Sequence, residues 1–432
     1  MNNKTKQSRV PKLRFPEFEE VGEWEIKRLN EIAEPITEKA GTGRYKLMSI
    51  TAGLGLVSQM KKFGREIAGE SYKNYYVIRE GDFAYNKSST KQDPEGQVAL
   101  LENEEQGAVP NSIFTCFRVN KSYVSPYFLK YPFVNNIHGR WLKRFISVGA
   151  RANGALNVET KDLFALPIPI PSLPEQQKIA DCLSSLDDLI AVQSQKIKAL
   201  ETHKEALMQQ LFPAESETVP KLRFSEFEEV GEWKNVRLGK LIKINSGRGF
   251  KASEYSKNGT RLLQIENVGY GKVKWNENTI YLPPNYSLEY EKLVLREGDL
   301  ILALNRPVTN NQLKIARLAQ RDAPSILYQR VGKIELISDS IISEYIFQLC
   351  QWFVRDFVVK KSVGSDQPFV SLNELYAQEL VVPSLPEQQR IADCLSSLDD
   401  LITAQSQKLD ALKLHKKGLM QNLFPNPNDI DE

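Results

Sequence analysis

The sequence predicts a mixed α/β protein in which two globular domains are joined by two long antiparallel coiled-coil helices, as a pseudo-twofold internal repeat. Three observations lead to this prediction: a short opening segment and a long helical segment each occur twice, the long segments have a heptad pattern, and the stretches between them alternate short strand-like and helix-like runs. With 432 residues, the chain has room for about two to four domains.

The repeated segments are nearly identical. Residues 10–24 have the sequence VPKLRFPEFEEVGEW and residues 219–233 have VPKLRFSEFEEVGEW, so that only Pro16 and Ser225 differ. Residues 171–213 match residues 383–425 at 33 of 43 positions. Because there are only two copies of about 200 residues each, the pattern indicates a duplication of whole domains and not a solenoid.

The repeat divides the chain into seven predicted segments. They are an N-terminal repeated segment (1–24), a first globular domain (25–170), a central long helix (171–213), a linker with the second opening segment (214–233), a second globular domain (234–382), a C-terminal long helix (383–425) and a tail (426–432). The two globular stretches share only short matching sequences, such as Glu80-Gly81-Asp82 and Glu297-Gly298-Asp299. This contrast predicts a scaffold that presents one surface twice and two modules that recognise different targets. The alternative is a recent duplication whose loops have drifted.

Each long segment is predicted to form one helix, from residue 174 to residue 211 in the first copy. Ser172 and Glu175 match a capping box, and Ser384 and Glu387 repeat it. Apolar residues at alternating spacings of four and three predict a coiled-coil seam: Ile179, Leu183, Leu186, Ile190, Ile197, Leu200 and Leu207 in the first copy, and Ile391, Leu395, Leu398, Ile402, Leu409, Leu412 and Leu419 in the second.

Such a seam needs a partner, and the other copy, packed antiparallel, is the nearest one. Four polar residues interrupt the pattern: Gln193, Lys204, Gln405 and Lys416. We interpret them as tolerated positions that snorkel to solvent or fix the register of the pair.

Composition excludes several classes of protein. The apolar share of 41% and the charged share of 26% are typical of a globular chain. No apolar run reaches the ~18 residues of a membrane helix, and the start of the chain lacks the apolar core of a signal peptide, so we expect a cytoplasmic protein. Four cysteines without a CxxC pair and three histidines predict neither a disulfide framework nor a metal site.

Catalytic motifs are absent from the sequence. There is no Walker loop, no GxGxxG after a strand, no HExxH and no GxSxG. The sequence therefore predicts a chain that is not an enzyme and holds no cofactor of its own. An enzyme with an unrecognised site is one rival hypothesis, and a pure scaffold or interaction protein is another.

Charge gives a weak, collective indication of nucleic-acid binding. The net charge is only +3, but Lys and Arg outnumber Asp and Glu by 20 to 15 in residues 25–165 and by 21 to 15 in residues 234–380. Loop residues able to hold phosphates or pair with base edges form the candidate DNA-binding set. They are Lys61, Lys62, Lys87, Lys91, Arg140, Lys143, Arg144 and Arg151 in the first domain, and Arg248, Lys251, Lys272, Lys274, Asn305, Arg306, Lys360, Lys361 and Gln367 in the second.

These features together resemble the DNA-specificity (S) subunit of type I restriction-modification enzymes, the HsdS family, over essentially the whole chain. The resemblance depends on the two-copy layout, on the PKLRF openings at Pro11 and Pro220, and on the approach to each long helix. That approach is IPIPSLPEQ from Ile168 and VVPSLPEQ from Val381, the latter without the first proline.

The resemblance implies two target-recognition domains, each recognising one half of a bipartite site on double-stranded DNA. It also implies that the helices act as a spacer and dock two methyltransferase subunits, with two translocase-nuclease restriction subunits joining the complex. S-adenosylmethionine, ATP and Mg²⁺ would belong to those partners. The sequence does not specify the recognised bases, the spacer length or the residues that contact bases.

Overall fold

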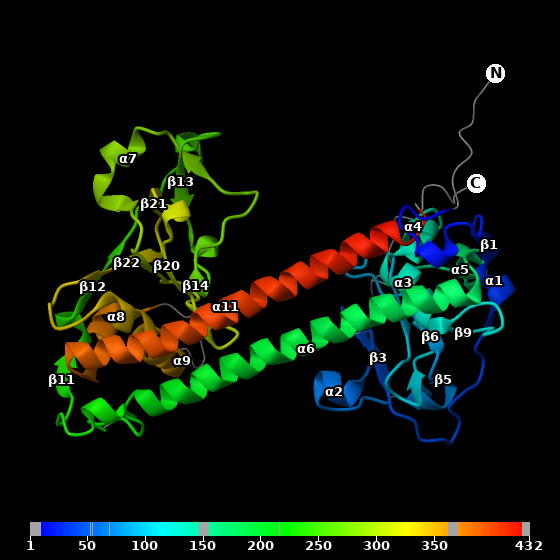
Figure 1. The fold of residues 1–432 in the computed structure, drawn as a ribbon, viewed down its shortest axis with the longest axis horizontal. Coiled ribbons are helices and arrows are strands. Elements are labelled where there is room, and N and C mark those ends of the chain that lie inside the picture. Colours follow the sequence, from blue (N-terminus) through cyan, green and yellow to red (C-terminus); the bar gives the residue numbers. More distant parts are fainter. Residues whose placement is uncertain are drawn as a thin grey trace. The chain divides into compact units, whose positions relative to one another are not determined.

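The structure is a computed structural model that describes residues 10–425 apart from residues 52, 54, 69, 147–154, 216 and 362–369. The chain divides into two compact units (Figure 1). Unit 1 comprises Met1–Gln193 and Lys408–Glu432, and unit 2 comprises Ser194–Gln407. The predicted fold class, a mixed protein with two domains and long helices, is confirmed. Each long helix, predicted as a segment of its own, contributes to both units.

Unit 1 contains short antiparallel strands and short helices. Its strands are β1 (Glu25–Arg28), β2 (Ala33–Pro35), β3 (Met48–Thr51), β4 (Gly55–Ser58), β5 (Tyr76–Arg79), β6 (Asp82–Asn86), β7 (Gln97–Leu100), β8 (Gln106–Val109), β9 (Phe114–Val119) and β10 (Pro167–Ile170). Its short helices are α1 (Leu29–Ile32), α2 (Gln59–Phe63), α3 (Pro126–Val134), α4 (Ile137–Leu142) and α5 (Thr160–Phe164). Four strands form a sheet in the order β2-β9-β6-β7, and β1-β10, β3-β4 and β5-β8 form pairs.

Unit 2 contains two larger sheets. Its strands are β11 (Lys234–Arg237), β12 (Ile242–Ser246), β13 (Thr260–Leu263), β14 (Gly271–Lys272), β15 (Tyr281–Leu282), β16 (Val294–Leu295), β17 (Leu300–Ala303), β18 (Val308–Thr309), β19 (Gln312–Leu313), β20 (Ile315–Arg317), β21 (Ser325–Leu327), β22 (Val331–Leu336) and β23 (Glu379–Val382). Its short helices are α7 (Tyr286–Glu289), α8 (Ser343–Leu349), α9 (Arg355–Lys361) and α10 (Leu372–Ala377). The sheets have the orders β12-β22-β17-β20-β14 and β15-β13-β21-β16, and β18-β19 and β11-β23 form separate pairs.

The two units share a structural frame although their sequences differ. The order β2-β9-β6-β7 of unit 1 has the same chain connectivity as β12-β22-β17-β20 of unit 2. In each unit an antiparallel pair, β1-β10 or β11-β23, joins the strand after the opening segment to the strand before the long helix. The repeat therefore extends to the fold of the divergent stretches.

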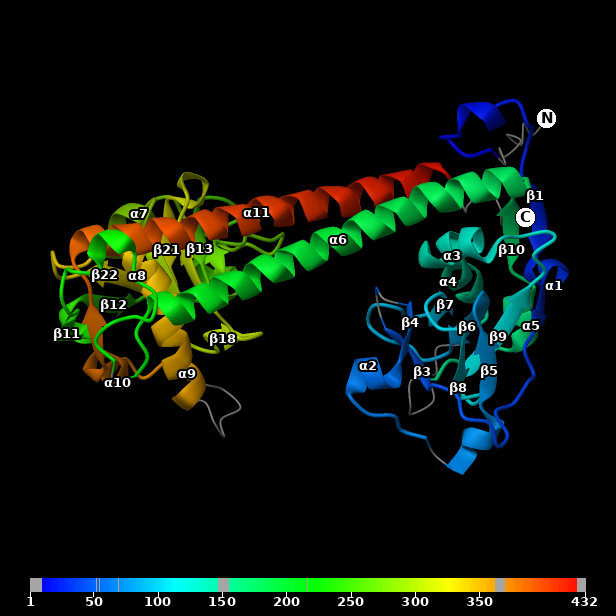
Figure 2. The same ribbon diagram turned by 60° about the horizontal axis from the view of Figure 1, so that its bottom comes forward.

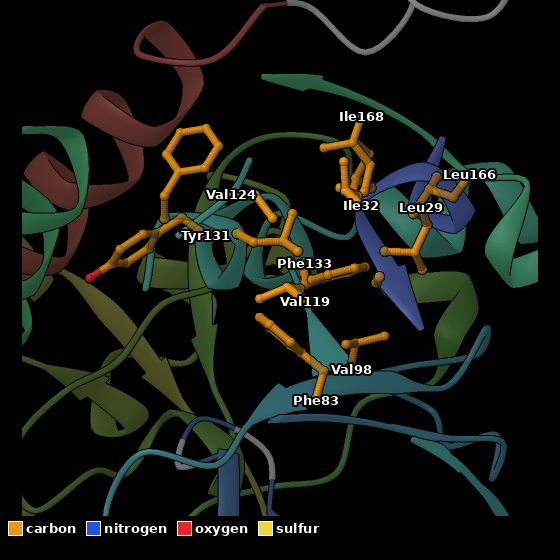
Figure 3. Packing of buried hydrophobic residues seen from close by; sticks show 14 of the residues in the cluster. Leu29, Ile32, Phe83, Val98, Val119, Val124, Tyr131, Phe133, Leu166 and Ile168 are labelled. Atoms are coloured by element: carbon orange, nitrogen blue, oxygen red, sulfur yellow. The ribbon is translucent and has the colours of Figure 1, made fainter. Parts of the chain in front are cut away.

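The core of unit 1 joins its sheet to its helices (Figure 3). Phe83 on β6 stacks on Phe117 of β9 with ring centroids 5.0 Å apart, and Phe133 of α3 packs against both rings. Ile179 and Leu183 of the long helix α6 (Leu173–Leu211) belong to the same cluster, so the helix start is part of the domain core. Burial of these side chains is the main stabilising contribution in this region.

The start of α6 differs from the predicted capping box. The Glu175 carboxylate is fully buried and accepts hydrogen bonds from the Arg14 guanidinium at 2.7 Å to each oxygen and from the Trp24 indole N–H at 3.2 Å. The next residue, Gln176, donates to the carbonyls of Pro171 and Tyr123. Glu175 thus connects the opening segment to the helix instead of capping the helix. The hydrogen bond between Arg14 and Glu175 raises the pKa of the Arg14 guanidinium.

Unit 2 repeats this anchor at the start of α11 (Leu385–Asn422). Glu387 accepts from Arg223 at 2.7 and 2.8 Å and from the Trp233 indole at 3.2 Å. Gln388 donates to the carbonyls of Pro383 and Ser340. In both units the opening segment therefore forms a buried contact with the LPEQQ sequence at the start of the long helix. This contact requires both segments, which explains why they are repeated together.

Within each unit the two long helices run antiparallel. In unit 2 the Lys204 ammonium of α6 lies 2.7 Å from the Asp399 carboxylate of α11. In unit 1 Lys416 of α11 pairs with Asp187 of α6. The lysines that interrupt the seam are thus held by aspartates of the opposite helix. Along the seam, the apolar residues of both helices are buried or half-buried.

We predict that Glu175→Ala lowers the free energy of unfolding by about 3–5 kcal/mol, because it leaves the buried Arg14 guanidinium and Trp24 N–H without their acceptor. Glu387→Ala should have a similar effect in unit 2. Urea unfolding followed by tryptophan fluorescence measures both effects. Glu20→Ala, at an exposed position of the same opening segment, is the control. A loss below about 1 kcal/mol for Glu175→Ala would contradict the anchor.

Candidate nucleic-acid interface

A buried carboxylate fixes the turn that leads into the central strand of unit 1. Asp82 at the start of β6 accepts hydrogen bonds from the Arg79 backbone N–H and the Arg118 guanidinium of β9, each at 2.7 Å. Gly81 has a φ of 90°, a conformation that glycine adopts without steric cost. The loop that leaves the other end of β6 therefore starts from a rigid strand.

Unit 2 has the same turn before β17. Asp299 accepts from the Arg296 backbone N–H and from the Lys333 ammonium of β22, each at 2.8 Å. Gly298 has a φ of 84°. The Glu-Gly-Asp sequence that occurs in both domains thus forms the same turn, which positions β6 in unit 1 and β17 in unit 2.

The first candidate cations lie on helix α2 and on the loop after β6 in unit 1. Lys61 and Lys62 are exposed on α2, but the Lys62 ammonium donates to the Ile50 carbonyl at 2.7 Å. Lys87 is half-buried directly after β6, and burial lowers its pKa. Lys91 is exposed at the tip of the same loop, residues 87–96. The structure thus places Lys87 and Lys91 on one loop and Lys61 and Lys62 on another element.

The loop that carries Lys87 and Lys91 is held at its far end by a buried histidine. His138 of α4 is hydrogen-bonded through Nε2 to the Gly96 carbonyl at 3.1 Å. Burial lowers the pKa of His138 to about 4, so the ring is neutral near pH 7 and Nε2 must carry the proton that it donates. The loop is therefore fixed at both ends, with its polar tip exposed.

A second group of cations lies on and after α4. Arg140, Lys143 and Arg144 are exposed, and the Arg144 guanidinium lies 4.2 Å from the ring centroid of Trp141. This stacking orients a planar cation beside an aromatic surface. Arg151, which was predicted with this group, lies outside the described residues.

In unit 2, Arg248 follows β12 and stacks on aromatic rings. Its guanidinium lies 5.3 Å from the ring centroid of Phe250 and 4.7 Å from that of Tyr290. Lys251 is exposed, and its backbone N–H donates to Glu254 at 2.7 Å. Both side chains are accessible to a ligand, although Glu254 also lies 3.9 Å from Arg248.

The structure brings another group of candidates together around one tyrosine. Lys272 and Lys274 are exposed, and the Lys274 ammonium lies 5.6 Å from the ring centroid of Tyr270. The Tyr270 hydroxyl donates to the Thr309 carbonyl at 3.1 Å, on the segment that also carries Asn305 and Arg306. Arg306 is exposed and Asn305 is half-buried.

The last candidates are already engaged with acidic side chains. Lys360 pairs with Glu215 at 2.9 Å, and Lys361 pairs with Glu374 at 2.7 Å. A phosphate would have to compete with these carboxylates. Gln367 lies outside the described residues. The assignment of all these residues to DNA contacts stays a prediction.

Sequence reasoning missed the polar hairpin β18-β19 next to Arg306. Its turn residues Asn310 and Asn311 both have positive φ values, of 53° and 60°. The signal was present in the sequence, because consecutive asparagines between short β-prone residues are typical of a two-residue hairpin turn.

An apolar surface that occurs in both units lies where the opening segment contacts the long helix. In unit 1 a pocket of about 380 Å³ is lined partly by Val21 and Leu173, which are 53% and 42% exposed. In unit 2 the matching residues Val230 and Leu385 are 53% and 43% exposed. Both units therefore expose the same apolar side chains to the same extent.

The described residues show no metal cluster. Among them, no group of three or more His, Cys, Asp or Glu side chains is arranged to hold a metal ion. In the same part of the chain, no helix is long and apolar enough to span a membrane.

Comparison with known proteins identifies one family. Residues 22–202 and 230–414 each match the family described as "Type I restriction modification DNA specificity domain". The type I restriction enzyme MjaVIII specificity subunit of Methanocaldococcus jannaschii is 36% identical over 283 residues, which are 65% of this chain and 66% of that protein. The putative MjaX specificity subunit of the same organism is 24% identical over 420 residues, 94% of each chain.

Two solved structures have a similar fold. One is the S subunit of a type I restriction-modification system from M. genitalium, with a TM-score of 0.54, 14% identity and coverage of 96% of this chain and 99% of that one. The other comes from work on complex assembly and conformational transition of the type I R-M system, with a TM-score of 0.51, 17% identity and coverage of 94% and 98%. At these identities the comparison concerns the fold alone.

The chain belongs to the family of type I restriction-modification DNA-specificity subunits, because the two family matches together span most of it. It is thus a sequence-specific DNA-recognition subunit and not an enzyme, as the resemblance in the sequence implied.

Proposed function

We propose that each globular domain recognises one half of a bipartite DNA site, while the two long helices set the spacing between the halves. The observation that supports this most directly is the common frame of the two domains, which carries unrelated loops. Both sheets have the same strand order, and in both a turn fixed by an aspartate, Asp82 or Asp299, leads into the strand before the variable loop. We call it the aspartate turn; the loop starts at Lys87 in unit 1 and at Leu304 in unit 2. Equivalent loops of different sequence allow each domain to have its own specificity.

The spacer role is supported by the way in which the helices contribute to both units. Residues up to Gln193 of α6 belong to unit 1 and the rest of that helix to unit 2, whereas α11 begins in unit 2 and ends in unit 1. Each unit thus contains the start of one helix and the end of the other. The ion pairs of Lys204 with Asp399 and of Lys416 with Asp187 fix the register within each unit.

The repeated surface offers a docking site for the partners of the chain. The apolar residues Val21 and Leu173, with Val230 and Leu385 in the other unit, offer two copies of one docking site. Two methyltransferase subunits are the proposed occupants, and two restriction subunits join the assembly. S-adenosylmethionine, ATP and Mg²⁺ belong to those subunits, which supply the chemistry.

Exchange of residues 25–165 for the same region of a relative tests the modular function. We expect one half of the methylated motif to change and the other half to stay, because the second domain and both helices are unaltered. Sequencing that detects modified bases, in cells that express the partner subunits, measures the motif. A change in both halves would contradict independent recognition.

Aspartate substitutions test the docking surface. Val21→Asp combined with Leu173→Asp should reduce the number of bound methyltransferase subunits from two to one, because charge in the apolar patch opposes burial. Native mass spectrometry of the purified complex counts the subunits. Leu288→Asp, at an apolar residue that is 84% exposed and outside the repeat, is the control. Retention of both subunits by a variant with all four positions changed would exclude this surface.

A further inference from the structure

We propose that the hairpin β18-β19 is the base-recognition element of unit 2, and that Asn310, Asn311 and Gln312 contact base edges in the major groove. This inference rests on the proposed function and specifies where the second domain obtains its specificity. It is carried by the geometry of the turn, by the anchoring of the hairpin base and by the cations beside it.

Both turn positions of the hairpin carry side chains, although their positive φ values favour glycine. Asn310 and Asn311 have φ values of 53° and 60°, as in a type I′ turn, in which the second position is most often glycine. Asparagine tolerates this region of φ less well than glycine does. A side chain retained at such a position, at an exposed tip, is available for contact with a ligand.

The base of the hairpin is held rigidly. Leu313 is 3% exposed and belongs to the main core of unit 2, and Val308 opposite it packs against the same cluster. The Lys314 N–H donates to the Pro307 carbonyl at 2.7 Å. Within the hairpin, residues 308–313, the four tip residues 309–312 are exposed, whereas Val308 is half-buried and Leu313 is buried. A rigid base orients the tip before binding, which reduces the entropy lost on complex formation.

The hairpin has the form and the polar chemistry of a groove-binding element. It is a separate two-stranded antiparallel pair, and Figure 2 shows β18 apart from the strands labelled β12, β13, β21 and β22. The major groove of B-DNA admits a two-stranded ribbon, and Asn and Gln form bidentate hydrogen bonds with the N6 and N7 atoms of adenine. The tip is therefore suited to base pairs that contain adenine.

Cations lie on the segments that adjoin or contact the hairpin. Arg306 is exposed three residues before Thr309, whose carbonyl accepts from the Tyr270 hydroxyl. The Lys274 ammonium lies over the Tyr270 ring, and Lys272 is exposed on the adjoining β14. These side chains would hold phosphates, and the amides would provide specificity.

Unit 1 has a loop at the equivalent place. The Leu156 N–H donates to the Lys87 carbonyl after β6, as the Val370 N–H donates to the Leu304 carbonyl after β17. In unit 1 the loop then forms a turn between Thr90 and Asp93, with exposed side chains at residues 91 and 92. The two domains thus present polar tips of different sequence from one frame.

The test uses the full chain in complex with its methyltransferase partner. Asn311→Gly combined with Gln312→Ala removes two amides, and the glycine preserves the type I′ turn. After the wild-type motif is known from sequencing of modified bases, binding is measured with a duplex that carries the motif and with a scrambled duplex. Asn258→Ala, at an exposed amide on another loop of unit 2, is the control.

We expect the variant to bind the motif duplex about 10- to 100-fold more weakly, with unchanged affinity for the scrambled duplex and with relaxed specificity in one half-site only. Arg306→Ala should instead weaken both duplexes and reduce the salt dependence by about one ion.

Three outcomes overturn the inference or its premise. Binding by the Asn311→Gly and Gln312→Ala variant within about twofold of the wild type, with an unchanged motif, excludes the hairpin as the base-recognition element. A defect in assembly with the partner but none in DNA specificity assigns the hairpin to a protein interface. If the wild-type complex itself shows no sequence preference, the proposed function fails before the hairpin is tested.

Discussion

The structure depends on a buried carboxylate at the start of each long helix. Glu175 and Glu387 are almost completely buried, and each is neutralised by an arginine and hydrogen-bonded by a tryptophan from the opening segment that precedes its domain. An unpaired charge in this position would cost several kcal/mol, so the opening segment and the helix must fold together. Along the chain, each globular domain lies between its opening segment and the long helix that follows it. The anchor therefore joins the two ends of the domain, and the loops of the domain are free to differ.

This arrangement separates what is constant from what is variable. The anchors, the helix register and the aspartate turns before β6 and β17 recur in both units, whereas the loops that leave those strands have different sequences. Each unit therefore repeats one frame, and the loops in which we propose that its specificity resides do not contribute to the anchor. A substitution in such a loop can change recognition without a large loss of stability.

The sequence predicted the long helices and the two-domain mixed fold, because near-identical segments with a heptad pattern leave few alternatives. It did not predict the partners of the polar residues. The sequence predicts a capping box for Glu175, since Arg14 lies 161 residues away in the sequence and only the fold brings them together. For Lys204 the sequence predicts a tolerated position that snorkels to solvent or fixes the register, without naming a partner, and the ion pair with Asp399 of the opposite helix agrees with the register role. The candidate DNA contacts were chosen by charge, which does not distinguish Lys360 and Lys361, held by acidic side chains, from the exposed Lys91.

We propose that this chain supplies a bipartite DNA specificity to partners that carry out the chemistry. The most direct measurement is the adenine methylome of cells that express the methyltransferase partner, with and without this chain. We expect a motif of two specific halves separated by an unspecified spacer, present only when the chain is present. An intact, expressed partner that produces no motif with the chain, or the same motif without it, would contradict a role of this chain in DNA specificity.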